Sequence, residues 1–316
     1  MAVETITRIR AETGIEIPPA LLFELPTIHE LASAIQNYGV PELSSSLVAI
    51  RAGRGAVPFF CVHGVGGHVL RFFDLGQALP EARSFIGIES SGLRDLALLP
   101  ASVEALAARY IEEIRSFHPH GPYLLGGHSF GGFIAYEMAQ QLRKAGERVP
   151  MVVIFDTRIT QGPRFWRALG PPAALRYAGR YLAVRWGQRF RAYAREPLTG
   201  KLVRAKTAVG KRLFPGWEAE YGGKVDAQTE LPQNLKAVYE HNNTVLGKYH
   251  IKRYAGDLLL FKSEEQGEAK YYGWEELVDG RVETHYIPGK HVEILQPPGV
   301  SLVAEKIEQA IRARMG

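Results

Sequence analysis

The feature that most constrains the fold is a glycine-rich turn between an apolar run and a helical pattern. Residues 127–131 read Gly-His-Ser-Phe-Gly, with an apolar run at 123–125 before them and an amphipathic pattern at 133–145 after them. Gly127, Ser129 and Gly131 match G-x-S-x-G, in which the serine occupies a strained turn from strand to helix. Side chains at the two flanking positions would collide with neighbouring backbone. The turn therefore predicts that the Ser129 hydroxyl is exposed at one edge of a sheet.

Short apolar strands alternate with helices along most of the chain, which predicts an α/β fold with a mainly parallel, doubly wound sheet. Thr27 and Glu30 also have the spacing of a capping box at the start of a helix. The predicted strands are residues 59–62, 85–88, 123–125, 152–155, 257–261 and 282–287, and the predicted helices include residues 2–13, 102–117, 133–145 and 300–314.

A serine nucleophile needs a base, and the base needs a carboxylate that fixes its tautomer. Asp156 follows the strand 152–155, and His291 follows the strand 282–287 through the turn 288–290. The carboxyl ends of parallel strands meet at one edge of a sheet, where functional groups collect. Among ten histidines, His291 is preferred as the base. The alternative reading of Asp156 is a carboxylate that caps a loop.

The oxyanion of such a reaction needs two backbone N–H donors. The residue after the nucleophile, Phe130, supplies one of them, and the turn after the strand 59–62 is expected to supply the other. Val65 is the preferred donor in that turn and Gly64 is the alternative. The glycines there are spaced G-x-G-G, which does not fit the dinucleotide fingerprint G-x-G-x-x-G.

Composition narrows the environment in which the chain is expected to work. The single cysteine, Cys61, excludes an internal disulfide; it lies in an apolar strand and is interpreted as core. No apolar run reaches the roughly 18 residues of a membrane span, and charges interrupt the N-terminus where a signal peptide is apolar. We therefore expect a cytoplasmic protein without a membrane or metal site.

Positive charge is concentrated in one segment. Residues 161–212 contain 13 Lys or Arg and one acid, Glu196, whereas the whole chain has a net charge of +5. Arg185 and Arg189 are spaced to share a helical face, and Trp186 lies between them in the sequence. These three residues are candidate contacts for an anionic partner or an anionic substrate group. A solvated helix surface is the alternative, and nucleic acid is not needed to explain the charge.

From about Leu47 onward the chain resembles a type I thioesterase domain of polyketide or nonribosomal peptide synthetases, which have an α/β-hydrolase fold. Residues 58–64, the turn 127–131 and residues 249–257 carry this resemblance, together with residues 273–274 and 289–291. Residues 1–38 resemble the second half of an acyl carrier domain. The Asp-Ser-Leu motif that bears phosphopantetheine in carriers would fall before Met1, so we expect the C-terminal end of a megasynthase.

The resemblance implies a domain plan and a function. The expected plan is a partial carrier at 1–38, a linker at 39–47, and a thioesterase domain at 48–316 with a helical lid at about 160–245. The expected reaction transfers an acyl chain from a carrier's phosphopantetheine thioester to Ser129, and hydrolysis or cyclisation then releases it. No diffusible cofactor is expected, because the carrier brings its own phosphopantetheine arm. The resemblance also implies that the anionic partner of Arg185, Trp186 and Arg189 is an acidic acyl or peptidyl carrier domain. The alternatives are a free-standing serine esterase or lipase, and a non-catalytic module that docks carriers.

Overall fold

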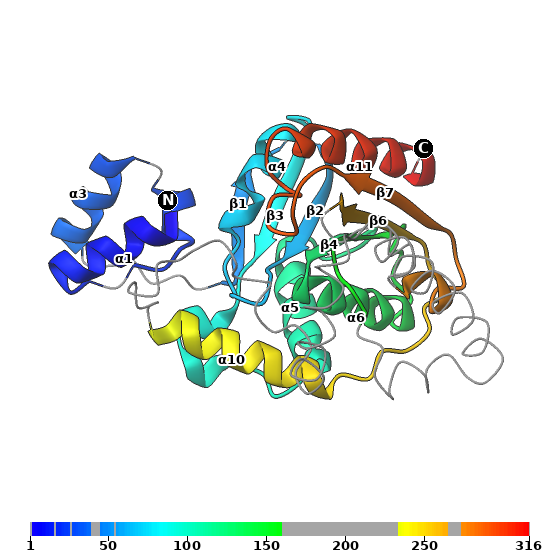
Figure 1. The fold of residues 1–316 in the computed structure, drawn as a ribbon, viewed down its shortest axis with the longest axis horizontal. Helices are drawn as coiled ribbons and strands as arrows, with labels where there is room; N and C mark the ends of the chain where they lie inside the picture. The colour runs from blue at the N-terminus through cyan, green and yellow to red at the C-terminus, as the bar shows by residue number, and fades with distance from the viewer. Residues whose placement is uncertain are drawn as a thin grey trace, which may run out of the picture.

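A seven-stranded sheet organises the part of the chain that the computed structural model describes, residues 2–15, 17–25, 27–38, 45–53, 55–159, 233–264 and 273–315. The strand order is β1-β3-β2-β4-β5-β6-β7 (Figure 1). β1 pairs antiparallel with β3, and the other neighbouring pairs are parallel. This is the predicted α/β-hydrolase architecture. The strands are β1 (Leu47–Arg51), β2 (Ala56–Val62), β3 (Arg83–Ile88), β4 (Leu124–His128), β5 (Val152–Phe155), β6 (Leu258–Ser263) and β7 (Val282–Ile287).

Helices cover both faces of the sheet, as the alternating pattern predicts. On one face α5 (Val103–Phe117) and α6 (Phe130–Lys144) bury their apolar sides against the strands. On the other, α4 (Phe73–Ala78) and α11 (Gly299–Met315) pack over a second core that includes Cys61 (Figure 1). Burial on both faces explains why the central strands β2 and β5 contain continuous apolar runs.

The boundaries around the central turn differ from the prediction. β4 continues through the two glycines to His128, and α6 begins at Phe130 instead of residue 133. Glycine is rare inside strands, which is why the sequence predicts a turn here. In the structure both glycines lie in β4. A Cβ at Gly126 would lie 2.7 Å from the phenyl ring of Phe59 and 3.2 Å from the carbonyl oxygen of Val153. The antiparallel edge strand β1 was not predicted.

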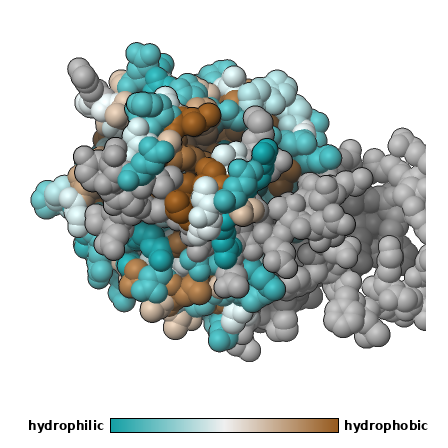
Figure 2. Space-filling model, turned by 90° about the vertical axis from the view of Figure 1, so that its left-hand side faces the viewer, coloured by the Kyte–Doolittle hydropathy of each residue, from teal (hydrophilic) through white to brown (hydrophobic). Residues whose placement is uncertain are grey.

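Three short helices precede the sheet: α1 (Ala2–Thr13), α2 (Leu21–Glu24) and α3 (Ile28–Tyr38). The predicted capping box is present, because the Glu30 amide donates to Thr27 Oγ1 at 3.2 Å and the Thr27 amide donates to Glu30 Oε2 at 3.1 Å. Ala20 and Phe23 pack against the core that α4 and α11 cover. Figure 2 shows this side of the molecule, where apolar side chains form small patches among hydrophilic ones.

The predicted linker and lid are only partly described. β1 begins at Leu47, the last residue of the linker predicted at 39–47. Of the lid predicted at 160–245, residues 233–245 belong to α10 (Gln233–Lys248), which packs against the loops that follow β3. Arg185, Trp186 and Arg189 lie outside the described residues. None of the helices in the described ranges is long and apolar enough to cross a membrane.

Candidate active site

Ser129 lies between β4 and α6 in a backbone conformation that few residues adopt. Its φ is 54° and its ψ is −117°, so the chain reverses direction there within one residue. Three hydrogen bonds hold the turn. The Ser129 amide donates to the Phe155 carbonyl at 2.9 Å, and the Ser129 carbonyl accepts from the Gly132 amide at 3.0 Å and from Thr157 Oγ1 at 2.7 Å. A strained residue fixed by several contacts is typical of a functional site.

The glycines around Ser129 allow this close packing. A Cβ at Gly127 would lie 2.1 Å from the Gly131 carbonyl oxygen, and a Cβ at Gly131 would lie 2.3 Å from the Val62 carbonyl oxygen. Real Cβ atoms do not approach backbone so closely. The predicted collision at both flanking positions is therefore found, and the strands β2 and β4 meet the start of α6 directly.

Asp156 and His291 are brought together at the same edge of the sheet. Asp156 follows β5, again with a positive φ of 50°, and His291 follows β7 through a turn. His291 Nδ1 donates to Asp156 Oδ2 at 2.7 Å. Both side chains are buried. Because Nδ1 carries the proton that Asp156 accepts, a neutral His291 presents Nε2 as its basic nitrogen.

Ser263, at the end of β6, completes the surroundings of the carboxylate. Its hydroxyl donates to Asp156 Oδ2 at 2.6 Å and its amide donates to Asp156 Oδ1 at 2.9 Å. Burial by itself raises the pKa of Asp156, but the hydrogen bonds from His291 and Ser263 outweigh burial and lower the pKa from 3.8 to about 2. Asp156 is thus a fixed negative charge beside the imidazole.

The turn that bears His291 is held by side chains of two segments that are distant in the sequence. His128 Nε2 lies 3.2 Å from the His291 carbonyl, and Arg71 Nη1 donates to the Val292 carbonyl at 2.5 Å. A carbonyl oxygen only accepts, so His128 carries its proton on Nε2. Burial, followed by the charge of Arg71, keeps the pKa of His128 well below 6.5. His128 is therefore a neutral donor to the turn that bears His291.

Two further histidines near the site are neutral for the same reason. Burial lowers the pKa of His63 to about 4, and burial together with Arg71 lowers the pKa of His68 to about 4. His63 Nδ1 lies 2.6 Å from the Gly64 carbonyl, and the Tyr110 hydroxyl lies 2.9 Å from His63 Nε2. His63 consequently supports the turn after β2.

A small pocket of about 30 Å³ joins these groups. Both Ser129 and His291 line it, as do the two oxyanion candidates Val65 and Gly64. Phe130 occupies the first position of α6, where backbone N–H groups have no partner within the helix and the helix dipole favours negative charge. The remaining lining residues are Gly66, His68, Arg71 and His128.

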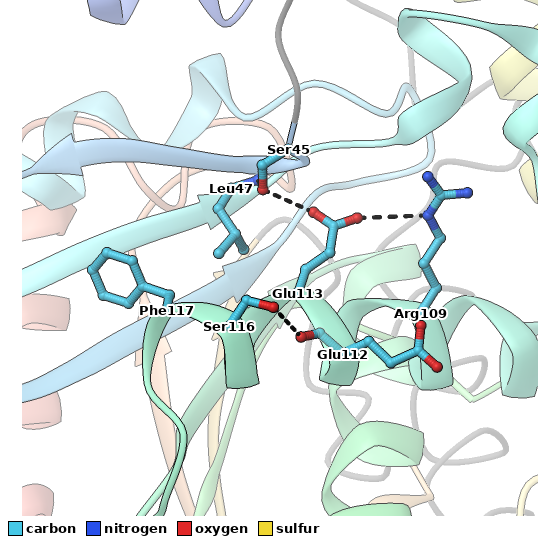
Figure 3. Close-up of a pocket in the computed structure, with 7 residues that line it drawn as sticks. All are labelled: Ser45, Leu47, Arg109, Glu112, Glu113, Ser116 and Phe117. Atoms are coloured by element: carbon cyan, nitrogen blue, oxygen red, sulfur yellow. Dashed lines mark hydrogen bonds and ion pairs between the residues drawn. The ribbon is translucent and has the colours of Figure 1, made fainter.

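A larger, shallower depression of about 840 Å³ lies elsewhere, between the start of β1 and α5 (Figure 3). Glu113 dominates it. Its carboxylate accepts from the Ser45 hydroxyl at 3.0 Å and from the Ser46 amide at 2.6 Å, and it forms an ion pair with Arg109 at 3.5 Å. These contacts fasten the segment before β1 to α5. The residues that line this depression therefore have a structural role, and none of the residues around Ser129 is among them.

The structure therefore brings Ser129, Asp156 and His291 to one edge of the sheet, with Val65 and Phe130 beside them. Sequence reasoning missed the residues that support them. Ser263 and Thr157 each end or follow a strand at this edge, which is a signal that was available. Asn242, on α10, donates from Nδ2 to the Val65 carbonyl at 2.8 Å. Like Arg71 and His128, it acts through a contact between distant segments, of which the sequence alone gives no sign. The supporting residues that were missed are Arg71, His128, Thr157, Asn242 and Ser263.

Comparison with known proteins supports a thioesterase domain. Residues 57–174 match the family model of the thioesterase domain, and residues 1–35 match the model of the phosphopantetheine attachment site. The chain is 29% identical over 321 residues to malpinin synthetase of Mortierella alpina, an alignment that covers 99% of this chain and 4% of that protein. The chain thus spans a small fraction of the length of this curated relative.

Solved structures agree with the fold. A four-domain nonribosomal peptide synthetase matches 98% of this chain and 23% of its own length, with a TM-score of 0.62 and 26% identity. The NocB thioesterase domain, in covalent complex with a fluorophosphonate nocardicin G analog, matches 82% of this chain and 96% of its own length. Its TM-score of 0.55 and 22% identity support the fold alone.

Proposed function

We propose that the thioesterase domain of this chain releases acyl chains from the phosphopantetheine thioester of a carrier protein. The observation that carries the proposal is the 2.7 Å contact between His291 Nδ1 and Asp156, with His291 and Ser129 lining one pocket. This is the arrangement that converts a serine hydroxyl into a nucleophile. The match of residues 1–35 to a carrier module supports a carrier-borne substrate.

The first half of the reaction transfers the acyl group to the enzyme. Ser129 Oγ attacks the thioester carbonyl while His291 Nε2 takes its proton. The negative charge that develops on the carbonyl oxygen is stabilised by the amides of Phe130 and Val65. The carbon–sulfur bond then breaks, and the thiol leaves with the proton from His291. Asp156 remains ionised throughout and stabilises the protonated imidazole.

The second half releases the product. Water, or a hydroxyl or amine of the acyl chain itself, attacks the carbonyl carbon of the acyl–Ser129 ester while His291 takes the proton that the attacking oxygen or nitrogen loses. Water gives a free acid and an internal nucleophile gives a ring. The proton returns to Ser129 as the ester bond breaks, which restores the enzyme. Burial lowers the pKa of His63, His68 and His128, which makes them weaker bases, whereas His291 has the carboxylate of Asp156 beside it to stabilise its protonated form.

The phosphopantetheine arm is part of the substrate in this proposal. Within residues 1–38 the sequence contains one serine, Ser33, which lies in α3 between two alanines and outside any Asp-Ser-Leu motif. Residues 1–38 therefore do not fit an attachment site, and we take the acyl chain to arrive on a carrier that bears its own serine. The domain plan of partial carrier, linker and thioesterase with a lid is proposed on the same basis.

A comparison of substrates tests the proposal. The purified chain is given an acyl thioester of pantetheine and the oxygen ester with the same acyl group, and the two values of kcat/KM are compared. A carrier-directed thioesterase turns over the thioester with a clear preference, and the Ser129→Ala variant turns over neither. A preference for simple oxygen esters would instead favour the free-standing esterase, and no reaction with either would favour a docking module.

A further inference from the structure

The turn after β2, which carries the proposed oxyanion donor, is fastened through its carbonyl groups. The Gly64 carbonyl accepts from the Gly67 amide at 3.0 Å and lies 2.6 Å from His63 Nδ1. The Gly67 carbonyl accepts from the Ser90 amide at 2.7 Å. These contacts come from the turn itself and from the end of β3, so they belong to the central sheet.

The Val65 carbonyl, which lies between those of Gly64 and Gly67 in the turn, is held from outside the central sheet. Val65 O accepts a hydrogen bond of 2.8 Å from Asn242 Nδ2, on α10. Asn242 has no exposed surface, and among the described residues its Oδ1 has no hydrogen-bond partner. A buried amide with one group unpaired is costly. Packing alone would favour a leucine at this position.

Apolar contacts set the position of α10 against the same turn. Val238, one helical turn before Asn242, is fully buried. Its Cγ1 would lie 2.6 Å from a Cβ placed on Gly67, and its Cγ2 would lie 2.9 Å from one on Gly92. Residues four apart share one face of a helix. The face of α10 that meets the turn therefore combines an apolar contact with a single amide donor.

The hydrogen bond from Asn242 constrains the direction of an N–H group. Each peptide unit is planar, so a fixed carbonyl fixes the whole unit. The contacts to Gly64 O hold the unit before Val65, and Asn242 holds the unit after it. The Val65 N–H belongs to the first of these units, which is joined to the second through the Val65 Cα. Turning this N–H away would change the φ or ψ of Val65 against the bond from Asn242, so Asn242 limits the directions in which the N–H can point.

We propose that Asn242 is a positioning residue for the oxyanion hole, acting through the carbonyl of Val65. This inference rests on the proposed function, because it assumes that the Val65 amide stabilises a tetrahedral oxyanion. It adds that α10, which is separated from the turn by more than 160 residues of sequence, is part of the catalytic apparatus (Figure 1). The placement of α10 then affects the rate of the chemical step.

The test replaces Asn242 and compares it with its neighbour. Asn242→Leu removes the donor at similar volume, and Asn242→Asp keeps the shape but places an acceptor against the Val65 carbonyl. Asn243→Leu is the matched control, because Asn243 Nδ2 donates within its own helix to the Tyr239 carbonyl at 2.9 Å. The single-turnover rate of Ser129 acylation is measured with an acyl thioester of pantetheine, and a thermal melt monitors folding.

We expect Ser129 to be acylated about 10- to 100-fold more slowly in both Asn242 variants, with the larger loss in Asn242→Asp. A misdirected oxyanion donor weakens the stabilisation of the transition state and leaves the binding of the substrate unchanged. The thioester concentration that gives half of the maximal acylation rate should change by less than about threefold. Binding of a trifluoromethyl ketone, whose adduct carries the same oxyanion, should weaken by the same factor as the rate. Asn243→Leu should behave as wild type.

Several results would overturn the inference. One is an Asn242→Leu variant that is acylated at the wild-type rate, and another is an Asn243→Leu variant that loses as much rate as Asn242→Leu. A third is an Asn242→Leu variant in which only the thioester concentration for half of the maximal rate has changed. If Asn242→Leu does not fold, the isosteric Asn242→Asp decides by the same criteria. Wild-type protein that forms no acyl–enzyme contradicts the proposed function itself, whereas acylation that is indifferent to Asn242 contradicts this inference alone.

Discussion

The turn at Ser129, the proposed nucleophile, and the turn at His291, the proposed base, lie at the same edge of the sheet but are held in place differently. The turn at Ser129 is shaped by glycines within five residues, whose missing side chains let β2, β4 and α6 meet. The turn at His291 is held by side chains from three other segments, namely Asp156, His128 and Arg71. The glycines of the first turn are neighbours in the sequence and can be recognised there, whereas the contacts of the second turn form only when the chain has folded.

The largest effect is expected where the two turns act as one unit. Ser129→Ala and His291→Ala should each lower kcat by about 10³-fold or more, because nucleophile and base depend on each other. The double variant should lose little more than either single variant. Steady-state kinetics with an acyl thioester of pantetheine measure this. Losses that multiply in the double variant would mean that the two residues act independently.

Breaking the nucleophile turn should cost stability as well as activity. In Gly131→Ala the new Cβ would stand 2.3 Å from the Val62 carbonyl oxygen, so β2 and α6 have to separate. Overpacking of this kind costs about 1–3 kcal/mol or more of unfolding free energy, and activity should be lost with it. Urea denaturation measures the stability.

Gly247→Ala is the control for this change, because a Cβ at Gly247, near the end of α10, meets no atom within 4 Å. It should keep wild-type activity and stability, or gain stability slightly. Equal behaviour of the two alanine variants would show that the close contact at Gly131 is not needed.

These two kinds of support explain what the sequence could and could not predict. The seven described strands include all six predicted ones. Most of them contain a buried apolar run, as in residues 59–62 and 152–155, whereas the edge strand β7 mixes polar and apolar residues. Ser129, Asp156 and His291 could be proposed because each follows a strand. Thr157 and Ser263 also follow or end strands, but nothing in their residue type distinguishes them. Asn242 depends on the packing of α10 on a turn far away in sequence, and only the folded structure reveals that contact.

A smaller effect is expected from weakening the support of the base turn. Ser263→Ala removes a 2.6 Å hydrogen bond to Asp156, so the pKa of Asp156 should rise from about 2 toward its ordinary value. Loss of a hydrogen bond to a charged group corresponds to roughly a tenfold drop in kcat. Ser84→Ala is the control, because it removes hydrogen bonds to Gly53 near the start of β3 and no contact to Asp156; it should leave kcat unchanged.

The same variant changes the pH dependence of stability. The pKa of Asp156 is lower in the folded chain than in the unfolded one, so its ionised form contributes stability above about pH 4, and this is lost as the pH falls toward about 2. The contribution is about 2 kcal/mol. Urea denaturation across this range should show a smaller pH-dependent loss for Ser263→Ala than for wild type. An identical loss in both would contradict the assigned hydrogen bond.

The smallest effect is expected from removing the N-terminal helices. Within residues 1–38, Ala20 and Phe23 pack on the core beneath α4 and α11, and none of the described residues of this segment lines the pocket at Ser129. Deleting the segment should leave kcat/KM for a small thioester within about twofold, while the newly exposed apolar surface lowers stability at roughly 25 cal/mol per Å². A large loss of kcat in a folded deletion variant would show that these helices shape the active site.

The central claim is that Ser129 carries the acyl chain, with His291 as its base. The most direct measurement is mass spectrometry of the intact chain, and of its proteolytic peptides, quenched during turnover of an acyl thioester of pantetheine. The account predicts one acyl group per chain, on the peptide containing Ser129, and no adduct in Ser129→Ala. Turnover without an adduct, or an acyl group on another residue, would contradict it.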